Sequence, residues 1–172
     1  YKKAIQINPN HPDAYTNLGV LYKNLGNLDQ ALASTLKSLE LKPDNPTAHM
    51  NLGGIYQDLG NLDQALASTL KSLELKSDNS DALTNLGGIY KDLGNLEQAL
   101  ASTRKSLELK PGCSKALYTL GRIQMTLGKT EEARKTLLYA IENNSQEFAA
   151  YYDLSKMLET KEQASELIKA IN

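Results

Sequence analysis

The sequence predicts an all-α protein built as a solenoid of antiparallel helix pairs. Three observations support this prediction. The 172-residue chain repeats itself every 34 residues, each repeat carries two apolar stripes of helical period, and no stretch alternates with the period of two typical of strands. A single helix pair cannot bury its apolar face, so stacked pairs are expected to share one continuous core.

The 34-residue period is visible in direct alignments of the chain with itself. Residues 12–45 and 46–79 are identical at 26 of 34 positions, and residues 46–79 and 80–113 are identical at 24 of 34. We therefore interpret residues 1–172 as a single array. Its expected parts are the second helix of a truncated repeat at 1–11, four repeats at 12–45, 46–79, 80–113 and 114–147, and a degenerate, shortened fifth repeat at 148–172.

Each repeat is expected to hold two helices joined by a glycine turn. In the first repeat, apolar residues from Tyr15 to Leu25 recur at helical spacing, Gly26 interrupts them, and a second stripe runs from Leu28 to Leu41. Proline then stops the second helix and suits the first turn of the next one. The predicted helices are 12–25, 28–41, 46–59, 62–75, 80–93, 96–109, 114–127, 130–143, 147–159 and 161–171, with a leftover helix at 1–7.

These residues resemble the tetratricopeptide repeat. The segment Asn17-Leu-Gly-x-x-Tyr22, followed by Gly26, Ala31 and Pro43, has the period and the Leu-Gly-x-x-Tyr core of that family. The resemblance implies a right-handed superhelix in which the first helix of each repeat lines a concave groove. The chain departs from the pattern at a few positions, among them Thr35, Thr69 and Thr103, where the family often has an aromatic residue.

Composition and charge narrow the classes of partner. The chain has 19 Lys+Arg and 20 Asp+Glu, so bulk charge does not favour nucleic acid or anionic lipid. No apolar run approaches the roughly 20 residues that span a bilayer. A lone Cys113 cannot form an intrachain disulfide, so we expect a reducing, cytoplasmic location. The expected partner is a protein or peptide, with no nucleic acid and no membrane.

The sequence offers little catalytic chemistry. Its two histidines, His11 and His49, have no metal-ligand spacing, and Cys113 has no nearby histidine that would activate it as a nucleophile. A glycine pair at Gly121 and Gly128 has six intervening residues where a phosphate loop needs four. We therefore expect no catalytic residue, no metal site, no cofactor and no enzymatic activity.

A ladder of asparagines is the first candidate binding feature of the groove. Asn17, Asn51 and Asn85 are spaced by 34 residues on the face that the resemblance assigns to the concave side. An amide can bond a peptide backbone without reading its side chains, and the ladder looks like that of the repeat region of O-GlcNAc transferases. Gly54 and Gly88, on the same face, would open the groove for a ligand. Simple duplication of one repeat explains the same pattern.

The fourth repeat supplies the second candidate feature. From Arg104 to Lys135 there are eight Lys+Arg against three Glu, a net charge of +5. Drift from the consensus near an array end is the alternative explanation. The peptide clamp of chaperone-binding repeats has Lys and Asn one turn apart, then Asn, then Lys and Arg in successive repeats. The corresponding pairs here are Asp13/Asn17, Thr47/Asn51, Asp81/Asn85 and Lys115/Thr119. The two asparagines are present but the lysines and the arginine are not, which disfavours a co-chaperone that binds a C-terminal acidic tail. The fourth repeat contributes the candidate groove residues Lys115, Tyr118, Thr119 and Arg122, and the fifth repeat contributes Tyr152 and Lys156.

Three functions remain open at this level. The leading hypothesis is a non-catalytic scaffold that binds an extended peptide or partner segment in the concave groove. The second is the substrate-recruiting arm of a larger enzyme, such as a glycosyl- or sulfotransferase, as arrays of this kind in bacterial multidomain proteins suggest. The third is a structural unit that self-associates weakly through the exposed ends of the array.

Overall fold

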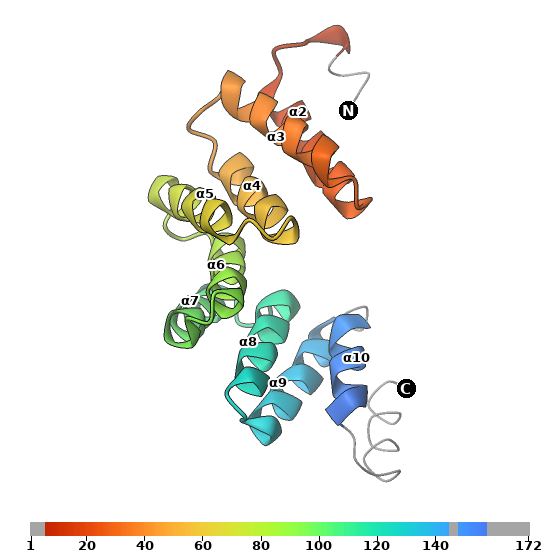
Figure 1. Cartoon of the computed structure of the whole chain (residues 1–172), viewed down its shortest axis with the longest axis vertical. Coiled ribbons are helices and arrows are strands. Elements are labelled where there is room, and N and C mark those ends of the chain that lie inside the picture. The colour runs from red at the N-terminus through yellow and green to blue at the C-terminus, as the bar shows by residue number, and fades with distance from the viewer. Residues whose placement is uncertain (1–5, 145–147, 158–172) are drawn as a thin grey trace.

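The computed structural model describes residues 6–144 and 148–157 of the chain (Figure 1). Within these residues it contains nine α-helices and no strand. The helices are α2 (Pro12–Asn24), α3 (Leu28–Leu41), α4 (Pro46–Asp58), α5 (Leu62–Leu75), α6 (Ser80–Asp92), α7 (Leu96–Leu109), α8 (Ser114–Thr126), α9 (Thr130–Asn143) and α10 (Phe148–Met157).

The helices from α2 to α9 confirm the expected all-α architecture. Each begins at the residue that the apolar stripes predict and ends within one residue of the predicted end. The helix predicted at 147–159 appears as α10 over its described residues. The helix predicted at 161–171, and most of the one at 1–7, lie outside the described residues.

Side-chain caps mark the starts of the first helices α4 and α6. The side chains of Asn45 and Asn79 accept hydrogen bonds of 3.2 Å from the backbone N–H of Ala48 and Ala82. Such a bond satisfies one of the N–H groups that have no partner inside a helix. Pro46 occupies the first turn of α4, where its missing N–H costs nothing.

A glycine in the left-handed region ends each of these first helices. Its φ lies between 73° and 79°, a conformation that side chains with a Cβ rarely adopt. The backbone then forms the bonds of a helix C-cap: the Asn61 N–H, for example, reaches the Tyr56 carbonyl at 2.9 Å. The predicted turn residues are therefore confirmed at Gly26, Gly60, Gly94 and Gly128.

The two helices of a pair approach closely at a second glycine. A Cβ added to Gly19 would lie 2.3 Å from the Thr35 hydroxyl oxygen, and one added to Gly87 would lie 2.1 Å from that of Thr103. In the fourth pair the corresponding neighbour of Gly121 is a leucine, Leu137. The small residue is thus required by the packing of the helix that follows it.

Polar residues fill part of the interior of the first three pairs. They include three fully buried threonines, Thr35, Thr69 and Thr103. The hydroxyl of Thr103 donates to the Ala99 carbonyl at 2.8 Å, whereas those of Thr35 and Thr69 have no hydrogen-bond partner within the described part of the chain. The interior therefore becomes less polar toward the C-terminal end. There an apolar cluster forms from Leu137, Ile141, Ala150 and Leu154.

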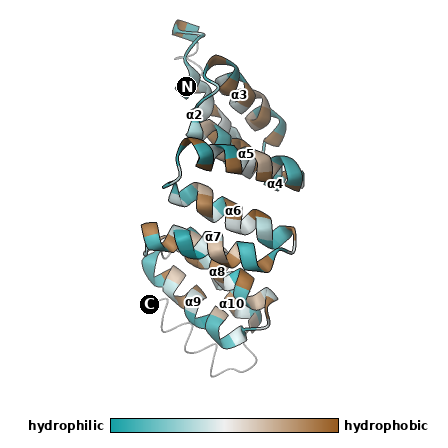
Figure 2. Ribbon diagram, turned by 90° about the vertical axis from the view of Figure 1, so that its left-hand side faces the viewer, coloured by the Kyte–Doolittle hydropathy of each residue, from teal (hydrophilic) through white to brown (hydrophobic). Residues whose placement is uncertain are grey.

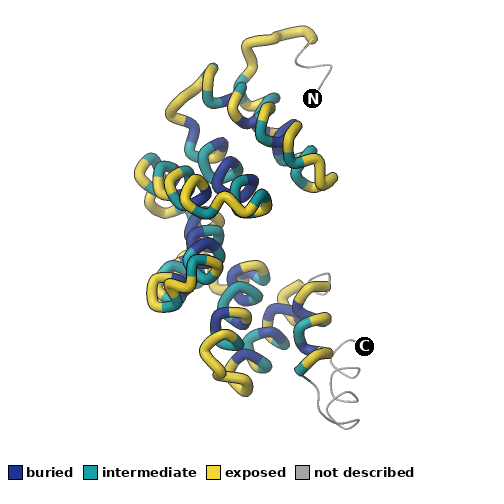
Figure 3. Tube along the Cα trace, in the orientation of Figure 1, coloured by how far each residue is buried: buried dark blue, intermediate teal, exposed yellow. Residues whose placement is uncertain are grey.

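The stacked pairs form an open arc. Figure 1 shows the first helices α4, α6 and α8 on the inner side and the second helices α5 and α7 on the outer side. In Figure 3 the buried residues follow the centre of this stack, and Figure 2 shows short hydrophobic stretches on every helix rather than one continuous patch. None of the helices in the described part of the chain is long and apolar enough to cross a membrane.

Candidate functional site: a concave groove

The inner side of the arc holds a groove with a volume of about 490 Å³. We call it the concave groove. Its walls come from α2, α4, α6 and α8, so residues from four helix pairs share one surface. The lining residues are Val20, Lys23, Asn24, Met50, Asn51, Gly54, Gln57, Asp58, Asp81, Thr84, Asn85, Gly88, Lys91, Asp92, Lys115, Tyr118, Thr119 and Arg122.

The structure brings six of the nine candidate residues into this lining: Asn51, Asn85, Lys115, Tyr118, Thr119 and Arg122. Three candidates lie outside it. Asn17 is an exposed residue of α2, and Tyr152 and Lys156 lie on α10, where the Lys156 ammonium sits 4.2 Å from the centre of the Tyr152 ring.

The three asparagines of the predicted ladder have three different environments. Asn17 is exposed. The side-chain nitrogen of Asn51 is buried and has no acceptor among the residues that the structure describes. Asn85 is bonded at both ends: its nitrogen donates to the Met50 carbonyl at 3.4 Å, and its oxygen accepts from the Lys115 ammonium at 2.9 Å. Asn51 is therefore the ladder residue with an unused donor inside the concave groove.

The groove contains a second set of repeated contacts that the candidate residues did not include. The Lys23 ammonium pairs with Asp58 at 2.7 Å, and the Gln57 amide donates to Asp92 at 2.7 Å. Each contact joins a residue of one first helix to a residue 35 positions later. The partner of each residue stands in the next repeat, so the pairing does not follow from the sequence of one repeat alone.

The glycines on the groove floor make room for these contacts. A Cβ on Gly54 would lie 3.3 Å from the Cε of Lys23, and a Cβ on Gly88 would lie 3.1 Å from the Gln57 side-chain nitrogen. The space above Gly54 and Gly88, which we expected to be open for a ligand, is thus occupied in this structure by side chains that cross the groove.

The fourth repeat interrupts this pattern. Arg122 stands at the position of the floor glycines, and Thr126 stands where Asp58 and Asp92 stand in the preceding repeats. Lys91 therefore finds no carboxylate in the next helix and pairs with its own neighbour, Asp92. The Arg122 guanidinium lies 3.8 Å from a carboxylate oxygen of Asp153 and 5.9 Å from the Tyr118 ring centre. The basic end of the groove is therefore connected to α10.

Two titratable groups in the groove have shifted pKa values. Burial alone would raise the pKa of Asp92, but hydrogen bonds from Lys91 and Gln57 and the nearby positive charges bring it below its ordinary value. The Lys115 side chain as a whole is exposed, yet burial around its ammonium, followed by the positive charge of Lys23, lowers the pKa of Lys115. Both pKa values thus depend on burial in the groove and on charged groups nearby.

No group of three or more potential metal ligands occurs among the described residues. His49 bonds the Pro43 carbonyl at 2.8 Å, and Cys113 is buried at the start of α8.

A stack of helix pairs whose first helices line one continuous surface defines a helical-repeat protein. The chain belongs to the tetratricopeptide-repeat family. Models described as "Tetratricopeptide repeat" match residues 1–33, 44–111 and 92–158, and a model described as "TPR repeat" matches residues 21–60. No curated protein sequence matches the chain.

Solved structures share this fold. TTC0263, a thermophilic TPR protein in Thermus thermophilus, is 20% identical with a TM-score of 0.80, over 92% of this chain and 87% of that one. Pseudomonas aeruginosa pilF is 24% identical with a TM-score of 0.78, over 93% and 74%. YrrB, described as "a TPR protein with an unusual peptide-binding site", is 25% identical with a TM-score of 0.64, over 99% and 89%.

Proposed function

We propose that this chain is a non-catalytic scaffold that binds an extended segment of a partner protein in the concave groove. The observation that carries the proposal concerns Asn51, a residue of the groove lining whose buried side-chain nitrogen has no acceptor among the described residues. A buried donor without a partner costs about 1–3 kcal/mol. A peptide carbonyl would remove that cost on binding. The peptide-binding site described for YrrB supports the same use of this fold.

The proposal assigns different roles to the candidate residues. Asn51 bonds the backbone of the segment, while Tyr118 and Arg122 provide contact area and charge at the basic end of the groove. Asn85 positions Lys115, because its side-chain oxygen accepts a hydrogen bond of 2.9 Å from the Lys115 ammonium. Tyr152 and Lys156 contact only a segment long enough to continue from Arg122 onto α10.

The test is a peptide-array screen of the whole chain, followed by titration of the best peptide. Asn51→Ala should weaken binding by about twofold to tenfold, the equivalent of one hydrogen bond. Asn17→Ala is the matched control, because it removes the same amide from the same repeat position outside the groove. Equal losses in the two variants, or no loss in either, would refute the groove as the binding site.

A convex site would also contradict the proposal. Lys37 and Lys71 lie on the second helices, where they pair with Glu40 and Glu74. Binding that Lys37→Ala and Lys71→Ala abolish, while Asn51→Ala leaves it intact, would move the site to the outer side of the array.

Self-association is a second candidate, supported by one observation. Leu21 is 44% exposed, whereas its counterparts in the next three repeats, Ile55, Ile89 and Ile123, are fully buried. The side of α2 that carries Leu21 is thus more exposed than the same side of α4, α6 and α8. Recruitment of substrates for a larger enzyme and a cytoplasmic location stay predictions.

A further inference from the structure

The floor of the concave groove is covered by the chain's own side chains at two glycines. A Cβ on Gly54 would lie 3.3 Å from the Cε of Lys23 and 3.8 Å from its ammonium nitrogen. A Cβ on Gly88 would lie 3.1 Å from the nitrogen and 3.8 Å from the oxygen of the Gln57 amide. Gly54 lines the groove and is nevertheless buried. Each glycine therefore leaves a space that a side chain of the preceding repeat fills.

An aspartate on the same helix as each glycine fastens the covering side chain. The Lys23 ammonium pairs with Asp58 at 2.7 Å, and the Gln57 amide nitrogen donates to Asp92 at 2.7 Å. Each aspartate follows its glycine by four residues, which places the two on one face of the helix. The side chains of Lys23 and Asp58 are 30% and 44% exposed, and ion pairs between partly exposed groups are weak. The cover is thus fastened but releasable.

The fourth repeat shows the arrangement without the glycine and the aspartate. Arg122 and Thr126 stand at these two positions on α8. Lys91 follows Gln57 by 34 residues, but it pairs with Asp92 on its own helix α6 instead of crossing to α8. Crossing of the groove floor therefore accompanies glycine and aspartate in the repeat that receives the side chain.

We propose that Lys23 and Gln57 hold the concave groove in a self-occupied state, and that a partner segment displaces them when it binds along α4 and α6. The Gln57 amide has the donor and acceptor atoms of a peptide group, so it occupies Gly88 as a bound backbone would. A segment that must displace an internal occupant binds with an affinity reduced by the fraction of time that the floor is open. The inference rests on the proposed function, because it concerns access to the same groove.

The test removes the cover and measures binding. The intact chain and a double variant, Lys23→Ala with Gln57→Ala, are screened on the same peptide array and titrated with the best array peptide. The double variant should bind that peptide about threefold to tenfold more tightly, as expected for a floor that is open about a tenth to a third of the time. Unchanged or weaker binding would overturn the proposal, since the two side chains would then be irrelevant to the peptide or in contact with it.

A second variant releases the cover without removing it. Asp58→Asn keeps Lys23 but replaces the carboxylate that fastens it. This variant should bind the best array peptide about twofold more tightly, because the floor opens more often. Weaker binding would mean that Asp58 itself contacts the peptide, which contradicts its role as a fastener.

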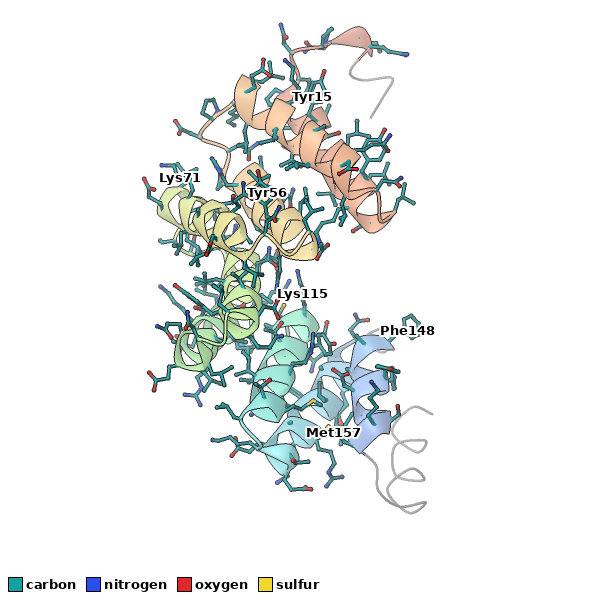
Figure 4. The ribbon with its side chains drawn as sticks, in the orientation of Figure 1. Tyr15, Tyr56, Lys71, Lys115, Phe148 and Met157 are labelled. Carbon is teal, nitrogen blue, oxygen red and sulfur yellow. The ribbon has the colours of Figure 1, made fainter. Side chains whose placement is uncertain are left out.

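Two lysines provide matched controls. Lys91→Ala removes a lysine from the repeat position of Lys23, but from a side chain that pairs with its own helix. Lys71→Ala removes the same charge from α5, where Lys71 pairs with Glu74 on the outer side of the arc (Figure 4). Both variants should bind the best array peptide as the intact chain does. A gain in either that equals the gain in the double variant would assign the effect to lost charge and overturn the proposal.

NMR follows the displacement directly. The side-chain amide signals of Gln57 report its bond to Asp92 in the free chain. Addition of the best array peptide should move these signals toward the positions of a solvent-exposed glutamine. Signals that stay in place while the peptide is bound would show that the floor remains covered, and would overturn the proposal.

The two proposals fail in distinguishable ways. If the intact chain binds a peptide that depends on Asn51, but the double variant binds it no more tightly, the groove function stands and the self-occupied state is wrong. If the double variant gains affinity for a peptide whose binding does not depend on Asn51, the self-occupied state stands and the role of Asn51 falls. If neither chain selects a peptide, both proposals fall.

Discussion

A Cβ atom on Gly53 would lie 2.1 Å from the hydroxyl oxygen of Thr69, closer than any real contact of that kind. The Ala65 carbonyl oxygen would lie 3.1 Å from the same atom, on the other helix of the pair. The distance between α4 and α5 is therefore set by the absence of a side chain at Gly53.

This relationship predicts a pair of coupled variants. Gly53→Ala should lower the free energy of unfolding by about 1–3 kcal/mol, since overpacking forces the helices apart. Thr69→Ala in the same chain should recover part of that loss by removing the clashing hydroxyl. Urea denaturation of the two single variants and the double variant measures the coupling. Additive losses would show that Thr69 is not the group that limits the approach.

The buried threonines give a second matched pair. The Thr35 hydroxyl has no hydrogen-bond partner, whereas the Thr103 hydroxyl donates to Ala99. Thr35→Val should be neutral or raise the free energy of unfolding, because it removes an unsatisfied group. Thr103→Val should lower it by about 1 kcal/mol relative to Thr35→Val. Identical effects in thermal denaturation would mean that both hydroxyls are equally satisfied in solution.

Asp92 gives the array an acid-sensitive contact. Its folded-state pKa lies below the ordinary value, so the folded state holds the ionised form more strongly than the unfolded chain does. This contribution to stability is present above the ordinary pKa of about 4 and is lost as the pH falls through the lower, folded-state value. Asp92→Asn should flatten the pH dependence of the melting temperature in that acid range. Because the side chain is partly exposed, the effect at neutral pH should stay below about 1 kcal/mol.

The exposed side of α2 that carries Leu21 predicts weak self-association. Leu21 is 44% exposed, as is Leu70 on α5, but only Leu21 occupies a position that the other repeats bury. Sedimentation velocity at rising concentration should show association that Leu21→Lys abolishes and Leu70→Lys leaves unchanged. A strict monomer at high concentration would exclude the structural-assembly hypothesis.

Removal of one whole repeat should leave a folded array. Deleting residues 80–113 keeps the phase, because α8 would then follow α5 as α6 does in the intact chain. Nearest-neighbour stacking predicts a helical protein with a lower melting temperature. Circular dichroism checks both points, and a complete loss of helical signal would argue for one indivisible core.

The sequence by itself determined the helices and their turns, because these depend on neighbours within a few residues. The period of the apolar stripes defined α2 to α9 to within one residue, and the glycines after each first helix have the expected positive φ. The period places equivalent residues on one side of the array, and the resemblance to the tetratricopeptide repeat predicted which side is concave.

Tertiary structure alone decided which residues of that face are available to a ligand. Asn17, Asn51 and Asn85 are equivalent in the repeat pattern, yet they differ in the structure. Asn17 is exposed, the side-chain nitrogen of Asn51 is buried with no acceptor among the described residues, and Asn85 is bonded to Met50 and Lys115. The physical reason is that the contacts on this face run between neighbouring repeats, so the partner of a side chain depends on the residues of the adjacent repeat. Lys23 finds Asp58 and Gln57 finds Asp92, whereas Lys91 meets a fourth repeat with Arg122 and Thr126 in place of glycine and aspartate, and turns back to Asp92.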